Sequence, residues 1–292
     1  MTIRIGIVGS DNSHAEQFAK IANGLHDAGR VAGVRCVAIS APHNTRGRTK
    51  EVAAHGGIEH VVAAPEEMVD MVDAAMVVYR HGGLHLEGAM PFIEKKIPVF
   101  IDKPLATSVR DAKKLLEAAR RKKTPVASFS TLRFCDGFIE FQKEMKAIGD
   151  LKAGVFKSPG DLRSKYGGVF FYGIHAVELM HATMGYGARK VSAVARARHV
   201  LATVLFDGGR MAQLPILEGP AHTFHVTAHG TEGEVARRID PGAAYLAGMK
   251  VFLKMVRTGK EPFTHDELLE PVKVLEAIDK SIRTKRPVTL SR

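Results

Sequence analysis

The chain has 292 residues, of which 45% are hydrophobic and 25% charged, the usual balance of a folded globular protein. The length favours two domains, and the composition excludes a disordered, collagenous or low-complexity chain. The formal net charge of +11 favours anionic partners. Aromatic residues make up only 7% of the chain and no DNA- or RNA-binding motif is present, so we expect a small-molecule partner and no nucleic acid.

The N-terminus and the cysteines bear on the cellular location. The apolar run from Ile5 to Val8 is too short for a signal peptide, and no stretch approaches the length of a membrane span. Cys36 and Cys135 are the only cysteines, too few for a disulfide framework. We therefore expect a soluble, cytoplasmic protein without membrane contact.

The first part of the chain alternates short β-branched runs with amphipathic helical stretches. We expect strands at 3–8, 34–40, 75–79, 98–101 and 126–129, and helices at 13–28, 84–95 and 108–123, with a short helix opening at Pro65. Ser13 and Glu16 match a capping box at the start of the first helix. This alternation predicts βαβ units and a parallel sheet.

The pattern changes in the second part of the chain. A helix near 137–148, a glycine-rich loop and a helix around His175 precede several consecutive strand-like runs between Val191 and Val226. Consecutive strands predict an antiparallel sheet and a second domain. The tail returns to helix, with an apolar stripe between Leu268 and Ile282. We place the boundary near Pro125, which gives domains of residues 1–124 and 125–292.

A turn between the first strand and the first helix is the place where a dinucleotide fold holds its pyrophosphate, using helix N–H groups and the helix dipole. Here the turn runs from Gly9 to His14. The fingerprint G-x-G-x-x-G has glycine where this chain has Asp11 and His14, so the motif alone is weak and favours an ordinary capped turn that binds nothing.

The end of the second strand distinguishes the two nicotinamide dinucleotides, because an acidic residue there binds a ribose hydroxyl and an arginine accommodates a 2′-phosphate. The segment after Ser40 contains no acidic residue and carries Arg46 and Arg48. This pattern favours NADP. The alternative is that both arginines only form the exposed start of a helix.

Lys103 follows a parallel strand at the edge where open α/β sheets bind ligands. A lysine there polarises a hydroxyl or carbonyl group and stabilises a developing alkoxide, although a Lys-Pro pair at a strand end is also a common turn. His175 lies in the helix that follows the glycine-rich loop and is three residues before Glu178. Its imidazole suits proton exchange near neutral pH, and the alternative is a buried structural histidine.

Three histidines, His222, His225 and His229, resemble a metal-binding cluster in their spacing. In a strand the first two would point to opposite faces, so we interpret them as structural and expect no metal site.

Taken in order, these segments resemble the family of glucose-fructose oxidoreductase, inositol dehydrogenase and MocA-type dehydrogenases, essentially from end to end. The sequence from Asp102 to Ala106 is similar to the family's E-K-P-L-A, and Gly173-Ile174-His175 matches its glycine-rich helix entry. His85 resembles the histidine of the family's nucleotide loop, and Arg133 the arginine that opens its second domain.

The resemblance implies an N-terminal Rossmann domain with a doubly wound parallel sheet and a C-terminal α+β domain on an open, mostly antiparallel sheet. It also implies an NAD or NADP cofactor and oxidation or reduction of a sugar, polyol or similar hydroxyl compound. The second domain would bind substrate and form a homodimer or homotetramer through the exposed face of its sheet. Lys103 would bind cofactor and substrate, and His175 would be the acid/base.

Together the motifs and the resemblance predict a set of site residues. The cofactor-binding set is Gly9, Ser10, Asp11, Ser13, His14, Ser40, Arg46, Tyr79, Arg80, His81, His85 and Lys103. The substrate-binding set is Lys103, Arg133, Tyr172 and His175, of which Lys103 and His175 are catalytic. Arg133, Arg163 and Lys165 would favour an anionic substrate.

Two departures from the family pattern favour an alternative function. Asp11 stands in the phosphate turn, and Phe171 stands where the family often has an aspartate four residues before the histidine. These changes keep open a non-catalytic regulatory protein that senses a nucleotide or a sugar. Direct binding of DNA has little support in the sequence.

Overall fold

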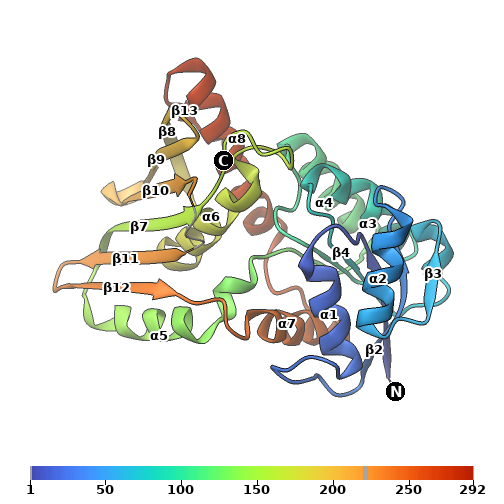
Figure 1. Cartoon of the computed structure of the whole chain (residues 1–292). Coiled ribbons are helices and arrows are strands. Elements are labelled where there is room, and N and C mark those ends of the chain that lie inside the picture. The colour runs from blue at the N-terminus through green and yellow to red at the C-terminus, as the bar shows by residue number, and fades with distance from the viewer. Residues whose placement is uncertain (1, 220–222, 292) are drawn as a thin grey trace. The chain divides into compact units, whose positions relative to one another are not determined.

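The computed structural model describes residues 2–219 and 223–291. Its backbone contacts divide the chain into two units, each built on one sheet (Figure 1). The first unit comprises Met1–Ala106, Arg110–Phe129 and Tyr245–His265, and the second comprises Thr107–Val109, Ser130–Ala244 and Asp266–Arg292. This division differs from a single boundary near Pro125, because a late segment returns to the first unit. There the ring of Tyr245 packs edge-on against Phe18, with 5.5 Å between ring centroids.

The sheet of the first unit is parallel throughout, as predicted. Its strands are β1 (Ile3–Val8), β2 (Val34–Ser40), β3 (His60–Val62), β4 (Ala74–Val77), β5 (Val99–Ile101) and β6 (Val126–Ala127). They lie in the order β3-β2-β1-β4-β5-β6, the doubly wound arrangement. The order reverses between β1 and β4, and ligands of such sheets bind at this point, beyond the carboxyl ends of the strands.

The helices of the first unit are amphipathic. They are α1 (Ser13–Asn23), α2 (Arg46–Gly56), α3 (His85–Glu94), α4 (Val109–Lys122) and α7 (Ala244–Thr258), with 3-10 turns η1 (Pro65–Met68) and η2 (Gly82–Leu84). The predicted apolar face of α4 is buried through Ala112, Leu115, Leu116 and Ala119.

The start and end of α1 correct two details of the prediction. Asn12 is the N-cap, and its side chain accepts a hydrogen bond from the His14 amide at 2.7 Å, so the capping box at Ser13 was wrong by one residue. The helix ends at Asn23, earlier than expected, because Gly24 takes the left-handed conformation with φ 74°.

The second unit contains a mixed sheet. Its strands are β7 (Leu151–Pro159), β8 (Ala188–Arg196), β9 (His199–Phe206), β10 (Met211–Leu217), β11 (Phe224–Gly230), β12 (Glu234–Ile239) and β13 (Val288–Thr289), in the order β12-β11-β7-β10-β9-β8-β13. Neighbouring strands are antiparallel except for β7 and β10, which run parallel. The open, mostly antiparallel sheet is therefore confirmed, although the sequence analysis missed β7 and β12.

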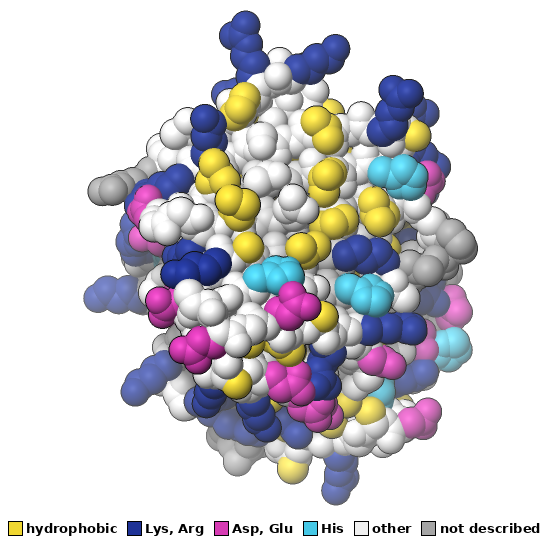
Figure 2. Space-filling model, turned by 90° about the vertical axis from the view of Figure 1, so that its left-hand side faces the viewer, with side chains coloured by type: hydrophobic (Ala, Val, Ile, Leu, Met, Phe, Trp, Pro, Cys, Tyr) yellow, Lys and Arg dark blue, Asp and Glu magenta, His cyan; other side chains and the backbone are white. Residues whose placement is uncertain are grey.

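The two faces of this sheet differ. Helix α6 (Phe170–Met184) contacts β7 and β10 on one face and is buried along most of its length. The other helices are α5 (Asp136–Glu144) and α8 (His265–Thr284), with 3-10 turns η3 (Thr131–Phe134), η4 (Met145–Ala147) and η5 (Asp207–Gly209). The strand residues Val194, Leu201, Leu205, Met211 and Leu217 remain exposed, and we call them the apolar sheet face. Figure 2 shows hydrophobic side chains gathered there.

Among the described residues, each helix is either too short or too polar to cross a bilayer.

Candidate active site

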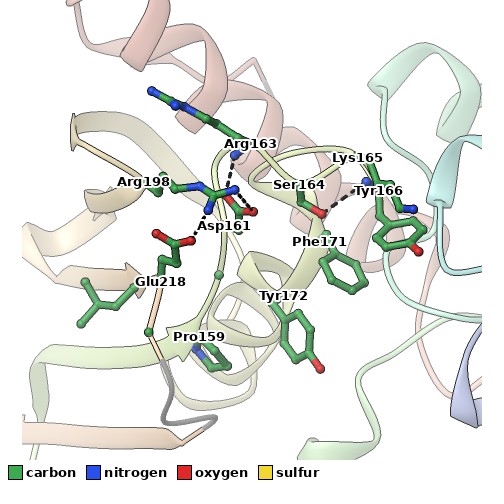
Figure 3. Close-up of a pocket in the computed structure, with 13 residues that line it drawn as sticks. Pro159, Asp161, Arg163, Ser164, Lys165, Tyr166, Phe171, Tyr172, Arg198 and Glu218 are labelled. Carbon is green, nitrogen blue, oxygen red and sulfur yellow. Dashed lines mark hydrogen bonds and ion pairs between the residues drawn. The ribbon is translucent and has the colours of Figure 1, made fainter.

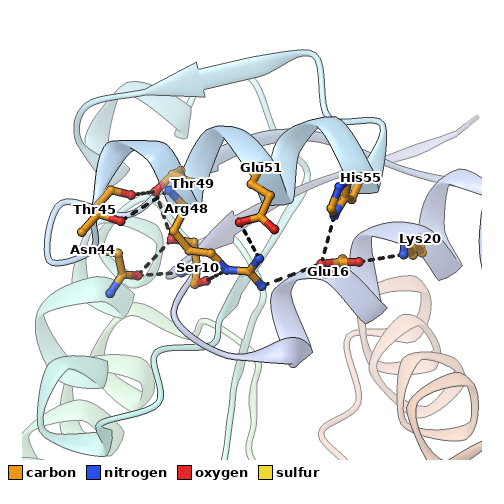
Figure 4. A network of polar contacts seen from close by, with 9 residues as sticks. All are labelled: Ser10, Glu16, Lys20, Asn44, Thr45, Arg48, Thr49, Glu51 and His55. Carbon is orange, nitrogen blue, oxygen red and sulfur yellow. Dashed lines mark hydrogen bonds and ion pairs between the residues drawn. The ribbon is translucent and has the colours of Figure 1, made fainter.

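The turn after β1 is held tightly against neighbouring elements. Gly9 has φ 101°, and a Cβ there would lie 2.8 Å from the Tyr79 amide nitrogen, so only glycine fits. The Gly9 amide donates to the carbonyl of Ser40, whose side chain is buried. The Ser10 amide donates to Asn44 Oδ1 at 2.7 Å, and the Ser10 hydroxyl lies 2.9 Å from Thr49 Oγ1 (Figure 4). The turn is therefore fixed to the start of α2.

The two arginines of α2 have different surroundings. Arg48 donates to the Ser10 carbonyl at 3.2 Å and forms an ion pair with Glu51 at 2.9 Å, so it holds the turn in place (Figure 4). The Arg46 side chain is exposed, and no described residue forms a side-chain hydrogen bond or an ion pair with it. Helix α2 begins at Arg46, so both arginines lie in its first turn, and the 2′-phosphate contact stays a prediction.

Pockets that hold small ligands commonly measure about 300–1,000 Å³. Beyond the end of β2 lies a cavity of ≈ 290 Å³ that Arg46 borders. Its remaining lining consists of Ala41, Pro42, Asn44, Thr49, Val61, Val62 and Ala63. Small apolar walls beside one cationic side chain fit the adenosine end of a dinucleotide.

Asp11 occupies the position of the second glycine of the fingerprint. Its carboxylate accepts a hydrogen bond from the Arg80 amide at 3.0 Å, which ties the turn to the segment after β4. The side chain therefore has a structural partner. Ser13 is the exposed first residue of α1, and its backbone stays at the helix N-terminus where a pyrophosphate would bind.

The segment after β4 carries three of the predicted cofactor residues. Tyr79 is buried, and this burial raises its pKa. His81 accepts a hydrogen bond from the Gly83 amide at 2.9 Å and caps η2. The His81 side chain is thus occupied within the first unit, whereas the buried Tyr79 hydroxyl has no hydrogen-bond partner among the described residues.

His85 lies between two backbone carbonyls. Its side chain is fully buried, with Nδ1 2.8 Å from the Pro104 carbonyl oxygen and Nε2 2.9 Å from that of Tyr79. Burial lowers its pKa. The side chain therefore connects the segment that carries Lys103 to the segment after β4, and its contact with a cofactor stays a prediction.

Lys103 lies at the carboxyl edge of the parallel sheet, as predicted, and shares a buried carboxylate with His14. Lys103 Nζ is 3.3 Å from Asp102 Oδ2, and His14 Nδ1 is 2.9 Å from the same oxygen. Burial alone would raise the pKa of Asp102, but the charges of His14 and Lys103 outweigh it and hold this pKa well below its usual range. The ammonium group is therefore anchored by a permanently ionised partner.

His175 is buried on α6 in the second unit, with 8% of its surface exposed. Its Nδ1 lies 2.8 Å from the hydroxyl of Ser130, and the ring packs edge-on against Phe224. The sequence analysis missed Ser130, because a contact across 45 residues leaves no local pattern. Tyr172 precedes the histidine with φ 66° and ψ −36° and interrupts the helix; such strain in a side chain other than glycine often marks a functional site.

Arg133, a predicted substrate-binding residue, is held by Glu178 and Tyr186. Its Nε is 2.6 Å from the carboxylate of Glu178 and donates to the Glu178 carbonyl, and its guanidinium donates to the Tyr186 hydroxyl at 3.1 Å. Arginine and glutamate are both buried. Burial raises the pKa of Glu178 and the charge of Arg133 opposes this shift, while burial raises the pKa of Tyr186 to about 12. Arg133 thus joins η3 to α6, and its contact with a substrate stays a prediction.

A cavity of ≈ 500 Å³ lies in the second unit beside Tyr172 (Figure 3). One wall holds Arg198 between the carboxylates of Asp161 and Glu218. The remaining charged and aromatic lining residues are Arg163, Lys165, Tyr166 and Phe171. Arg163 and Lys165 are exposed, as expected for groups that meet a ligand from solution.

Of the three histidines once compared with a metal cluster, His222 lies outside the described residues. His229 Nδ1 is 2.9 Å from Glu234 across the β11–β12 pair.

The doubly wound sheet, the turn at its switch point and Lys103 at its carboxyl edge define a Rossmann-type dinucleotide-binding unit. Residues 3–129 match the profile of the GFO/IDH/MocA oxidoreductase family, described as having an NAD-binding Rossmann fold. Over these residues, which make up less than half of the chain, the sequence is similar to that family, in agreement with the resemblance seen in the sequence.

Two curated relatives are inositol dehydrogenases. Inositol 2-dehydrogenase 1 of Saccharopolyspora erythraea is 32% identical over 158 residues, which make up 51% of this chain and 44% of that protein. Inositol 2-dehydrogenase of Gluconacetobacter diazotrophicus is 29% identical over 156 residues, which make up 51% of this chain and 42% of that protein. The aligned region therefore spans less than half the length of either relative.

Solved structures match the whole chain in fold. Scyllo-inositol dehydrogenase of Lactobacillus casei with bound NAD(H) and scyllo-inositol has a TM-score of 0.85 and 18% identity, with 99% of each chain covered. A myo-inositol dehydrogenase of Corynebacterium glutamicum has a TM-score of 0.83 and 19% identity, with 100% of each chain covered. At this identity the match establishes the two-domain fold.

Proposed function

We propose that the protein is an NAD(P)-dependent dehydrogenase that oxidises or reduces a sugar, a polyol or a related hydroxyl compound. The observation that carries this proposal is Lys103, which stands at the carboxyl edge of the doubly wound sheet with its ammonium group 3.3 Å from the buried Asp102 carboxylate. The similarity to inositol dehydrogenases supports the same class of substrate.

The cofactor would be held by the first unit. The turn from Gly9 to His14 would receive the pyrophosphate at the N-terminus of α1, and the cavity beside Arg46 would receive the adenosine end. When bound, the nicotinamide supplies the hydride acceptor or donor.

The protein's own groups handle the proton and the charge. In the oxidation direction, His175 takes the proton of the substrate hydroxyl, and the positive charge of Lys103 stabilises the resulting alkoxide. In reduction the same imidazole returns the proton. Tyr172, in the wall of the larger cavity, contributes to substrate binding.

The same cavity favours a substrate with an acidic group. Asp161 and Glu218 are both paired with Arg198, which leaves Arg163 and Lys165 as the cationic groups open to a ligand. A carboxylate or phosphate on the sugar or polyol would form charge-assisted hydrogen bonds with them.

The cofactor site is tested by titration with NADH and NADPH, followed by nicotinamide fluorescence, which no tryptophan obscures. We expect both to bind, and Arg46→Ala to weaken NADPH by about 10- to 100-fold with little effect on NADH, since a charge-assisted hydrogen bond contributes about 1.5–3 kcal/mol. Lys50→Ala, an exposed cation on the same helix, is the matched control. Equal weakening of both dinucleotides by Arg46→Ala would remove the 2′-phosphate assignment.

We also propose that the apolar sheet face pairs two copies of the chain. Val194 and Leu201 are register partners on β8 and β9, with 67% and 45% of their surfaces exposed. Apolar side chains this open to water commonly mark an interface. We expect light scattering to find a dimer or tetramer that Val194→Lys converts to monomer, while Leu25→Lys, on the first unit, has no effect. A wild-type monomer at micromolar concentration would contradict this interface.

A further inference from the structure

The group that orients His175 is identifiable from the contacts around η3. Ser130 precedes this turn and is fully buried, and its hydroxyl lies 2.8 Å from His175 Nδ1. The same oxygen accepts a hydrogen bond from the Leu132 amide at 3.3 Å. Phe171, at the position where an acidic neighbour was anticipated, has no group that could bond to an imidazole nitrogen.

The position of Ser130 relative to α6 is itself fixed. Arg133 of η3 forms the buried ion pair with the Glu178 carboxylate and donates a hydrogen bond to the Glu178 carbonyl. Glu178 is three residues after His175, so both lie on one face of the helix. The turn is therefore attached to α6 at two adjacent points, and its serine hydroxyl has little freedom to leave the imidazole.

The contact between Ser130 and His175 fits either tautomer, because the hydroxyl can accept from Nδ1–H or donate to a bare Nδ1. The proposed acid/base role selects one of the two. A neutral histidine accepts a proton at Nε2 only if its own proton is on Nδ1. A serine oxygen has two lone pairs, and the Leu132 amide uses one of them, so the second is available to an Nδ1–H donor. That bond persists when the ring is protonated, because Nδ1 carries a proton in both states.

We propose that Ser130 is the positioning residue for His175. It accepts a hydrogen bond from Nδ1–H, holds the ring in place and leaves Nε2 as the nitrogen that exchanges the substrate proton. This inference rests on the proposed role of His175 as the acid/base.

An imidazole NMR measurement tests the contact without any substrate. Long-range ¹H–¹⁵N correlation spectra report which ring nitrogen carries the proton, and the His175 signals are those that disappear in His175→Gln. We expect the neutral wild-type ring to carry its proton on Nδ1, Ser130→Ala to move it toward Nε2, and Ser130→Thr to keep it on Nδ1. Ser158→Ala is the matched control, since Ser158 is buried in the same unit and its hydroxyl has no hydrogen-bond partner among the described residues.

Kinetics test the consequence. Ser130→Ala should lower kcat by about 10- to 100-fold with KM nearly unchanged, the effect of a misplaced catalytic group, and Ser130→Thr should recover most of the loss. Ser158→Ala should retain the wild-type kcat. An unchanged tautomer in Ser130→Ala, or a changed tautomer with an unchanged kcat, would overturn the proposal. If the wild type transfers no hydride, the proposed function fails, and the NMR result still decides whether Ser130 sets the tautomer.

Discussion

The double variant Lys103→Met/His175→Ala is expected to lose turnover while it keeps its fold and still binds the dinucleotide through the other predicted contacts. Loss of a positioned acid/base typically lowers kcat by about 10²–10⁴-fold, and loss of a group that stabilises an oxyanion by about 10²–10³-fold. Each single variant should therefore lose at least about 10²-fold. Initial rates with a substrate of the wild type, together with circular dichroism and NADH titration, measure all three properties.

Control variants distinguish the loss of a catalytic group from an indirect effect of substitution on the fold. Lys113→Met removes an exposed lysine from the first unit, and His229→Ala removes a surface histidine from the second, and both should keep wild-type rates. Asp102 remains beside His14 in Lys103→Met, so the fold should survive. A double variant with full activity would show that neither residue acts in the reaction.

The second large effect is expected for stability, at the buried ion pair of Arg133 and Glu178. Arg133→Met removes the charge but keeps much of the side-chain volume, and it leaves the Glu178 carboxyl buried without its cation. Removing one partner of a buried pair usually costs about 3–5 kcal/mol. Urea unfolding followed by circular dichroism should therefore show a lower midpoint, whereas Arg163→Met, at an exposed position, should change the free energy by less than about 0.5 kcal/mol.

The loss of unfolding free energy in Arg133→Met should depend on pH in a defined direction. Burial raises the pKa of Glu178, and without Arg133 nothing of comparable strength opposes it. The folded variant then favours the protonated carboxyl, so its stability is best below the unfolded pKa of glutamate and falls as the pH rises through the folded pKa. We expect a smaller deficit at about pH 5 than at about pH 8. An equal deficit at both values would mean that packing, and not the buried charge, dominates.

The elements that the sequence predicted well are those with a strong local pattern. The alternation of apolar strands and amphipathic helices up to Phe129 predicts the parallel sheet correctly, because the central strands β1, β4 and β5 are largely buried on both faces, whereas the exposed edge strand β3 was missed. Strand β7 was missed because its residues alternate between buried and half-buried positions and include glycine and proline. The return of α7 to the first unit depends on packing between distant aromatic rings such as Phe18 and Tyr245, which no local pattern reveals.

The site residues that could be predicted are likewise those with a local sequence pattern. Lys103 and the turn from Gly9 could be predicted because a strand end and a helix start define their places. The partners of His85 and Arg133 could not be predicted from the sequence, since two backbone carbonyls and a buried glutamate leave no local pattern beside these residues. Ser130 has no motif at all and becomes visible only through its contact with His175.

Hydride transfer between the nicotinamide and a hydroxyl compound is tested directly by one measurement. The purified protein with NAD or NADP is mixed in turn with inositols, neutral sugars and sugar acids, and the absorbance of the reduced nicotinamide is followed. We expect stoichiometric reduction of NAD or NADP with at least one compound. The rate should be highest with a sugar acid, because Arg163 and Lys165 line the cavity. If the protein binds the dinucleotide tightly but none of these compounds reduces it, the proposed dehydrogenase activity is contradicted. The result would instead indicate a protein of the same fold that senses the nucleotide.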